Sequence, residues 1–301
     1  MFKGSIVALI TPFSDGQVDE DALRKLVDWH VEQGTNGIVP CGTTGESPTL
    51  SHEEHGRVVE IVVKQAAGRV PIIAGAGSNN TAEAVALTQH AEAAGADAVL
   101  HVAGYYNRPN QEGLYQHFKA LHDASDIPII VYNIPPRAIV DILPSTMQRL
   151  SDLPRIVGVK DATGDVARVS RERLLLGSDF CHLSGEDGTA LAYNSQGGHG
   201  CISVSANVAP KLCSEFQAAC TDGDYASALK LHDRLMPLHV ALFLEPSPAG
   251  VKFAAWRLGL CEAEARLPVV PLTEDTAEKI DVALRHVGLM NRCDEQIGCR
   301  K

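Results

Sequence analysis

Lys160 ends an apolar stretch in the segment "RIVGVKDATGD" (155–165). The residues before it, Ile156 to Val159, have the pattern of a buried strand, and a buried lysine loses hydration of its ammonium form, which lowers its pKa. The neutral amine of such a lysine can attack a carbonyl group and form a Schiff base. The alternative is a strand-end lysine that reaches solvent or pairs with Asp161. For an isolated lysine the alternative is the better explanation. The neighbouring residues must therefore decide between a catalytic lysine and a solvated or paired one.

A glycine-rich segment, "GTTGES" (42–47), could bind an anion through backbone N–H groups and the hydroxyls of Thr43 and Thr44. It lacks the lysine of a phosphate-binding loop, so a carboxylate fits better than a nucleotide. A plain turn would explain the glycines but not the adjacent threonines. "GAGSNN" (75–80) lacks the third glycine of a dinucleotide fingerprint, and we interpret it as a turn.

The segment "HEEH" (52–55) resembles a metal-binding helix only loosely. A zinc protease helix needs histidines four positions apart, whereas these are three apart and no third ligand is evident. Taken alone, the segment is a solvated helix start, and no metal is expected.

Eight short apolar runs could position these residues. Most of them are continuous rather than alternating, which is typical of strands buried on both faces of a parallel sheet. Helical patterns follow them, for example at 19–34, 51–68 and 80–95, where Ser51 with Glu54 and Asn80 with Glu83 have capping-box spacing. This alternation predicts an α/β fold, a (β/α)8 TIM barrel. The expected strands are 5–11, 37–40, 70–76, 97–102, 127–133, 155–160, 180–185 and 200–204.

The pattern changes after about residue 222, where three helices follow one another without a strand between them. We therefore expect a catalytic barrel over 1–223 and a C-terminal α-helical domain over 224–301, with a short polar tail from about 291.

Polar segments follow the strands at one rim, where a barrel of this kind has its active site. Their small, hydroxyl-bearing and cationic residues, and Tyr132 close to Lys160, favour a catalytic lysine over a solvated one. The segments are "CGTTGES" (41–47), "AGYYNRP" (103–109), "VYNIPPR" (131–137), "VKDATGD" (159–165), "SGEDGTA" (184–190) and "GGHG" (197–200).

The composition is that of a globular enzyme, with 45% hydrophobic and 21% charged residues among 301. A net charge of −11 argues against non-specific binding to nucleic acid or to an anionic membrane. The eight cysteines are scattered, as expected for reduced thiols, and Cys293 and Cys299 lie in the polar tail. No signal peptide and no run of about 18 apolar residues is evident, so we expect a cytoplasmic protein.

From about residue 1 to 290 the chain resembles the dihydrodipicolinate synthase family of pyruvate-dependent class I aldolases, to whose superfamily N-acetylneuraminate lyase also belongs. The motifs in this order are highly specific, although each alone is much less so. They are "GTTGES", "YYNRP", "YNIPPR", "GVKDATGD", "GGHGCISV" and "LEPSPAGVKFAAWRLGL".

The resemblance implies a catalytic group. Lys160 matches the lysine that forms a Schiff base with pyruvate, and Tyr132 matches the tyrosine that shuttles protons. Thr44 would link Tyr132 to Tyr106 of a neighbouring subunit. Thr43 and Thr44 would hold the pyruvate carboxylate.

The resemblance also implies the second substrate and the reaction. Arg137 would bind the carboxylate of L-aspartate 4-semialdehyde, and Gly185 and Ile202 would offer backbone contacts near the imine. Condensation of the two substrates would give 4-hydroxy-tetrahydrodipicolinate, the first committed step of the diaminopimelate and lysine pathway. No cofactor is needed.

Some family members carry a lysine feedback site at a subunit interface, and its pattern is present here. "HEEH" therefore becomes part of an expected inhibitor pocket, and we predict inhibition by L-lysine. Because Tyr106 acts in a neighbouring subunit, a homo-oligomer is needed, and a tetramer built as a dimer of dimers is expected. The residues that match are Ser47, His52, His55, Asn79, Glu83 and Tyr105, and the site also includes Pro48, at a position where a small residue such as alanine is expected.

Two other functions are compatible with parts of the pattern. A sister aldolase, such as N-acetylneuraminate lyase or a sugar-acid aldolase, would share Lys160, Tyr132 and the threonine loop. Arg137 argues against it, because an arginine suits a small acceptor with a carboxylate. A silent paralogue that senses a keto acid would not need the complete catalytic group.

Overall fold

The computed structural model describes residues 1–291, so the polar tail with Cys293 and Cys299 lies outside the described residues. Eight parallel strands pair in the order β4-β1-β10-β9-β8-β7-β6-β5. A bridge between Ile38 and Ile72 joins the two end strands, so the sheet closes and the predicted TIM barrel is confirmed. The barrel strands are β1 Gly4–Ala8, β4 Gly37–Val39, β5 Ile73–Gly75, β6 Ala98–Val102, β7 Ile129–Asn133, β8 Ile156–Asp161, β9 Cys181–Ser184 and β10 Gly200–Ser203.

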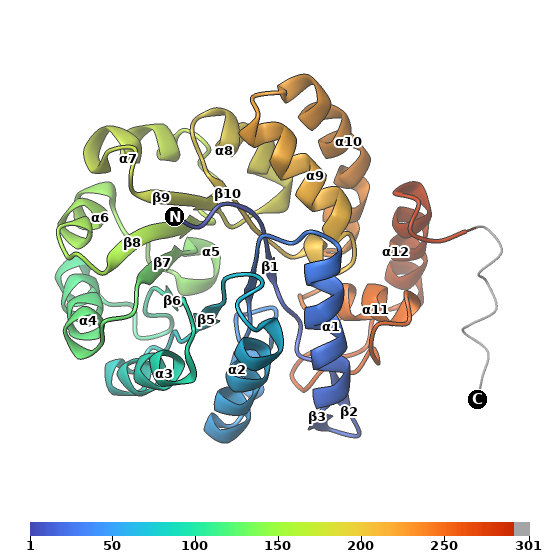
Figure 1. The fold of residues 1–301 in the computed structure, drawn as a ribbon, viewed down its shortest axis with the longest axis horizontal. Helices are drawn as coiled ribbons and strands as arrows, with labels where there is room; N and C mark the ends of the chain where they lie inside the picture. The colour runs from blue at the N-terminus through green and yellow to red at the C-terminus, as the bar shows by residue number, and fades with distance from the viewer. Residues whose placement is uncertain (292–301) are drawn as a thin grey trace.

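Helices surround the strands (Figure 1). Each strand is followed by at least one helix, as the alternation predicts, and three short 3-10 turns lie in the connections. The helices are α1 Glu20–Glu32, α2 His52–Ala66, α3 Thr81–Ala94, α4 Gln111–Ala124, α5 Pro135–Ala138, α6 Pro144–Ser151, α7 Arg168–Leu176, α8 Ala190–Ser195 and α9 Pro210–Thr221. The 3-10 turns are η1 Ser47–Thr49, η2 Asp187–Thr189 and η3 Ser205–Asn207.

The two N-caps predicted from the sequence, at Ser51 and Asn80, are present. Ser51 and Glu54 form the predicted capping box of α2, in which each side chain bonds the other residue's backbone N–H. Asn80 caps α3 by accepting from the Ala82 N–H. Glu83 does not complete a second box, because its carboxylate is engaged by Ser78 and His52 instead.

Three further helices follow α9 and lie to one side of the barrel in Figure 1. They are α10 Tyr225–Ala241, α11 Ala249–Arg257 and α12 Glu274–His286, as the pattern after residue 222 predicts. None of the helices within residues 1–291 combines the length and apolar character needed to cross a membrane.

A small antiparallel hairpin, β2 (Phe13–Ser14) with β3 (Gln17–Val18), was not predicted. Its turn residues Asp15 and Gly16 have φ values of 52° and 78°. Those angles suit the two-residue Asp-Gly turn that matches the twist of a hairpin. The segment "FSDGQV" therefore has the sequence pattern of a hairpin.

Side chains alternate across each strand, and one set fills the inside of the barrel. Ile130, Tyr132, Leu183 and Ile202 belong to this inner apolar cluster. Lys160 lies opposite Tyr132 on β7 and Leu183 on β9, and therefore on the same inner face. The Lys160 side chain, near the end of β8, therefore points into the barrel.

Candidate active site

Lys160 and Tyr132 meet at the C-terminal ends of neighbouring strands. The Lys160 Nζ lies 4.1 Å from the centroid of the Tyr132 ring. Both residues are almost completely buried, with 7% of each exposed. A buried amine beside a phenol has the composition needed for Schiff-base chemistry, which requires a nucleophile and a nearby proton carrier.

Asp161 does not pair with Lys160, although it is the next residue. Its Oδ1 accepts from the Thr163 N–H at 2.9 Å, and burial raises the pKa of its carboxyl group. Successive strand residues point to opposite faces, so Asp161 faces the surrounding helices. Within residues 1–291 no ion pair joins the two, and the alternative drawn for an isolated lysine does not apply.

Gly185 and Ile202 close the inner side of this group. A Cβ placed on Gly185 would lie 3.2 Å from Lys160 Cε and 2.8 Å from Ala162 Cβ. The glycine therefore allows the backbone to approach the lysine side chain closely. Ile202 is 1% exposed and packs in the inner cluster with Tyr132. The structure thus brings four predicted residues together.

The threonine loop follows β4 at the same rim. Thr44 is 6% exposed, whereas Thr43 is exposed. Gly45 fixes the loop against the segment that follows β1, because its carbonyl accepts from the Thr11 hydroxyl at 2.7 Å. The loop offers exposed and buried hydroxyls in one short segment, as binding of a small carboxylate requires.

Arg137 and Tyr106 lie on the loops after β7 and β6. Arg137 is exposed on α5, and Tyr106 is 93% exposed with a left-handed φ of 67°. Asn133 steadies the segment after α5 by donating to Asp141 Oδ1 at 2.8 Å. Neither Arg137 nor Tyr106 hydrogen-bonds to Lys160 within residues 1–291, and both side chains are exposed.

Among the residues of the expected inhibitor site, the structure pairs His52 with Glu83. His52 Nε2 lies 2.6 Å from Glu83 Oε1. The Ser78 hydroxyl, followed by His52, holds the pKa of Glu83 below its usual value. His55 is 4% exposed, contacts the Gly75 carbonyl at 2.9 Å, and has its pKa lowered by burial. The other members lie nearby in sequence or contact: Ser47 and Pro48 in η1, Asn79 before α3, and Tyr105 before Asn107, whose side-chain amide donates to the Asn79 carbonyl.

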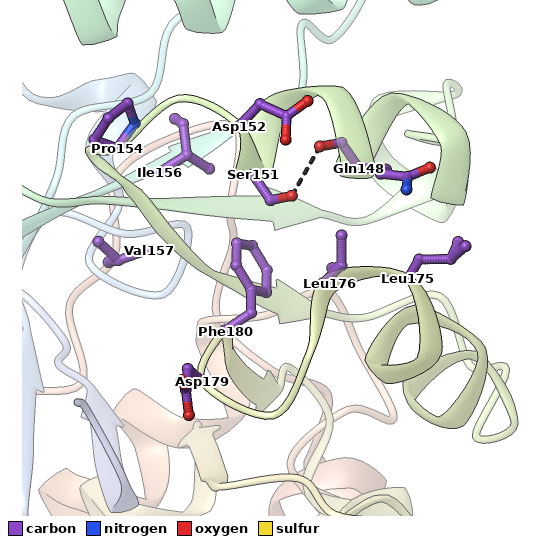
Figure 2. Close-up of a pocket in the computed structure, with 10 residues that line it drawn as sticks. All are labelled: Gln148, Ser151, Asp152, Pro154, Ile156, Val157, Leu175, Leu176, Asp179 and Phe180. Carbon is purple, nitrogen blue, oxygen red and sulfur yellow. Dashed lines mark hydrogen bonds between the residues drawn. The ribbon is translucent and has the colours of Figure 1, made fainter.

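A hollow of about 440 Å³ between α6 and α7 is not part of this site (Figure 2). It is lined by Ile156 and Val157 at the start of β8 and by Phe180 and Leu176. Lys160 is about 13 Å farther along the strand at 3.3 Å per residue. The hollow therefore opens at the end of the barrel that contributes to stability rather than chemistry.

Three residues that support the rim were not singled out from the sequence. Glu46 is buried within the threonine loop, and both of its carboxylate oxygens have partners, in Lys252 and in the Arg266 N–H. Glu46 could have been noticed because a glutamate is unexpected in a loop that binds an anion, unless it pairs with a cation. Lys252 in the apolar run "AGVKFAAW" was the matching signal.

The chain matches known proteins over nearly its whole length. The model of the Dihydrodipicolinate synthetase family matches residues 1–287. A 4-hydroxy-tetrahydrodipicolinate synthase from Parvibaculum lavamentivorans is 65% identical over 291 residues, covering 97% of this chain and 100% of that protein. The crystal structure of a chloride-inhibited dihydrodipicolinate synthase from Acinetobacter baumannii complexed with pyruvate is 47% identical, with a TM-score of 0.94 and coverage of 96% and 100%. The crystal structure of DHDPS from Cyanidioschyzon merolae with lysine bound is 34% identical, with a TM-score of 0.93 and coverage of 96% and 99%.

Proposed function

The chain belongs to the dihydrodipicolinate synthetase family, and from this premise we propose that it condenses pyruvate with L-aspartate 4-semialdehyde to form 4-hydroxy-tetrahydrodipicolinate. It is a Schiff-base-forming lyase of lysine and diaminopimelate biosynthesis. The observation that carries the proposal is the Lys160 amine, buried at the rim with its Nζ 4.1 Å from the Tyr132 ring centroid.

Lys160 is the proposed nucleophile. Its amine adds to the keto carbon of pyruvate and loses water, which gives an imine. Loss of a methyl proton gives an enamine, whose carbon attacks the aldehyde of the second substrate. The amino group of the adduct then attacks the imine carbon and releases Lys160 with the cyclic product. Each step moves a proton, which gives the Tyr132 hydroxyl its role, with Thr44 and Tyr106 as its relay.

Two groups bind the substrate carboxylates in this scheme. Thr43 and Thr44 hold the carboxylate of pyruvate, and Gly185 and Ile202 supply backbone contacts beside the imine. Arg137, exposed at the open side of the rim, holds the carboxylate of aspartate semialdehyde. The Arg137→Ala variant is expected to use aspartate semialdehyde poorly while forming the pyruvate imine at a nearly normal rate. Equal loss of imine formation would show that Arg137 has another role.

L-Lysine is the proposed feedback inhibitor, bound at the pocket that contains His52 and Glu83. The close pair of these side chains supports the proposal. A steady-state assay with both substrates tests the activity, and the same assay with millimolar L-lysine tests the inhibition. Unchanged rates with lysine would refute the inhibitor site without affecting the proposed reaction.

Subunit assembly completes the proposal. The exposed Tyr106 is available to a neighbouring subunit, which supports a homo-oligomer, and we propose a tetramer built as a dimer of dimers. The division into a barrel and a C-terminal domain near residue 223, between α9 and α10, is proposed on the change of pattern there. A cytoplasmic location stays a prediction of the sequence.

A further inference from the structure

The threonine loop is bounded by two residues in an uncommon backbone conformation. Cys41 has a φ of 53° and Glu46 a φ of 57°. Both are buried, with 2% and 3% exposed. Non-glycine residues adopt left-handed angles at a cost, so the surrounding structure must hold them there.

The partners of Glu46 come from the far end of the chain. Lys252 Nζ lies 2.5 Å from Glu46 Oε1, across 206 residues of sequence. The Arg266 N–H donates to Glu46 Oε2 at 2.9 Å, across 220 residues. The helical region after the barrel therefore supplies donors to both carboxylate oxygens.

The pair between Lys252 and Glu46 is fully enclosed. The Lys252 side chain is 0% exposed, and its Nζ lies 4.0 Å from the centroid of the Phe13 ring. Burial lowers the pKa of Lys252, and the Glu46 carboxylate opposes that shift. Each charge would be strongly destabilising without the other, so the pair fixes both side chains firmly.

Fixing Glu46 also fixes the threonines before it. The Glu46 N–H donates to the Thr43 carbonyl at 3.1 Å, and the Ser47 N–H donates to the Gly42 carbonyl at 3.3 Å. Gly45 packs closely against the backbone just after β1, since a Cβ there would lie 2.9 Å from the Leu9 carbonyl oxygen. The loop can therefore shift at the Glu46 end only if the carboxylate leaves its partners.

We propose that Lys252 is a positioning residue for pyruvate binding: with the Arg266 N–H it holds Glu46, and through Glu46 it sets the threonine loop in the geometry that receives the pyruvate carboxylate. The C-terminal helical region is in this respect a part of the active site. The inference rests on the proposed role of Thr43 and Thr44.

The test uses two variants and one matched control in the full chain. Lys252→Met keeps the length of the side chain and removes the charge. Glu46→Gln keeps the shape and an acceptor oxygen. The control Arg257→Met removes another largely buried ion pair of the same helix, between Arg257 and Asp281 at 2.8 Å, which does not contact the loop.

The expected readout is a change confined to pyruvate. For Lys252→Met the kcat/KM for pyruvate and the rate of borohydride trapping should fall about 10- to 100-fold, mainly through KM, because small misplacements carry losses of this size. Glu46→Gln should have a kcat/KM for pyruvate and a trapping rate between those of Lys252→Met and the wild type. The KM for aspartate semialdehyde should change little in either variant, and Arg257→Met should retain the wild-type KM for pyruvate.

Two results would overturn the inference. One is a destabilised Lys252→Met enzyme with wild-type KM and trapping rate for pyruvate. The other is an equal rise of KM in Arg257→Met, which would reveal a general effect of destabilisation. If Lys252→Met does not fold, Glu46→Gln decides in the same way. If the wild type itself traps no pyruvate, the proposed reaction is wrong, which is a separate outcome.

Discussion

Two lysines of this molecule are buried against an aromatic ring, and they differ in whether a carboxylate is present. Lys160 is 7% exposed, with its Nζ 4.1 Å from the centroid of the Tyr132 ring. Lys252 is 0% exposed, with its Nζ 4.0 Å from the centroid of the Phe13 ring. Lys252 has Glu46 at 2.5 Å, whereas Lys160 has no ion-pair partner within residues 1–291.

The difference supports a structural role for Lys252 and the proposed role of Lys160 as the nucleophile. A buried carboxylate stabilises the charged form of the lysine beside it, and the pair joins two distant segments of the chain. An amine without such a partner, at the rim of the barrel, can add to a carbonyl group. The rings differ in the same sense, because tyrosine carries a hydroxyl that can move protons and phenylalanine does not.

The largest expected effect is that of Lys160→Arg. Arginine has a side chain of similar length but cannot form the imine, so kcat should fall by at least about a thousandfold. The steady-state assay measures this loss. The exposed Lys211 provides the control, and Lys211→Arg should retain wild-type activity. Substantial activity in Lys160→Arg would remove the basis for assigning the two lysines different roles.

Substitution of Lys252 should destabilise the fold more than substitution of Lys160, which is the reverse of the expected order of their effects on kcat. Lys252→Met should lower the free energy of unfolding by about 3–5 kcal/mol, because it leaves Glu46 buried and unpaired. Lys160→Met should change it by about 1 kcal/mol or less, since no buried carboxylate loses its partner. Urea unfolding of both variants measures the difference. The double variant Lys252→Met with Glu46→Gln should recover much of the loss, and a double variant as unstable as Lys252→Met would contradict the pairing argument.

The hydroxyl of Tyr132 should matter and its ring should not. Tyr132→Phe gives Lys160 the same kind of neighbour that Lys252 already has in Phe13, so packing is kept and the proton carrier is lost. The expected result is a fall in kcat of about a hundredfold with little change in stability. Rapid-quench trapping of the imine would show whether its formation slows as well. A variant with normal kcat would assign proton transfer to another group.

Glu172 is a second buried carboxylate that can be compared with Glu46. Its Oε1 lies 2.8 Å from Arg168 Nε, but its buried Oε2 has no hydrogen-bond partner among residues 1–291, unlike either oxygen of Glu46. Burial outweighs the opposing effect of Arg168 and raises the pKa of Glu172 from 4.5 to about 7.

The sign of the resulting pH dependence follows from that shift. A raised pKa in the folded state contributes stability that is present below about pH 4.5 and is lost as the pH rises through about 7, at no more than about 1.4 kcal/mol per pH unit. The stability of the wild type relative to Glu172→Gln should therefore fall by about 1 kcal/mol between pH 5.5 and 6.5. Urea titrations at the two pH values measure it. A difference that stays level or rises with pH would place the Glu172 pKa elsewhere.

The barrel and its inner residues were predictable because their signals are local and repeated. All eight strands lie within or close to the expected apolar runs, and β7 and β8 are neighbours in sequence and in the sheet. Parallel neighbours end at the same rim, so Tyr132 and Lys160 had to meet. The proposed role of Lys160 could be predicted from the barrel rim, the threonine loop and Tyr132 together, because a lysine at the end of a strand does not by itself indicate catalysis.

The role of Lys252 could not be predicted in that way. It lies inside a helix, and its carboxylate partner is 206 residues earlier in the chain. Neither "AGVKFAAW" nor "GTTGES" has a pattern that predicts contact between the two segments. Their contact arises from how the C-terminal helices pack on the barrel. A buried charge in each segment signals that a partner exists, but only the tertiary structure identifies it.

Borohydride reduction of the protein with pyruvate, followed by mass mapping of peptides, tests the central claim most directly. We expect one reduced pyruvate adduct per chain, on the peptide that contains Lys160, and an unmodified peptide that contains Lys252. The Lys160→Arg variant should give no adduct. An adduct on Lys252, or no adduct on the wild type, would contradict the account.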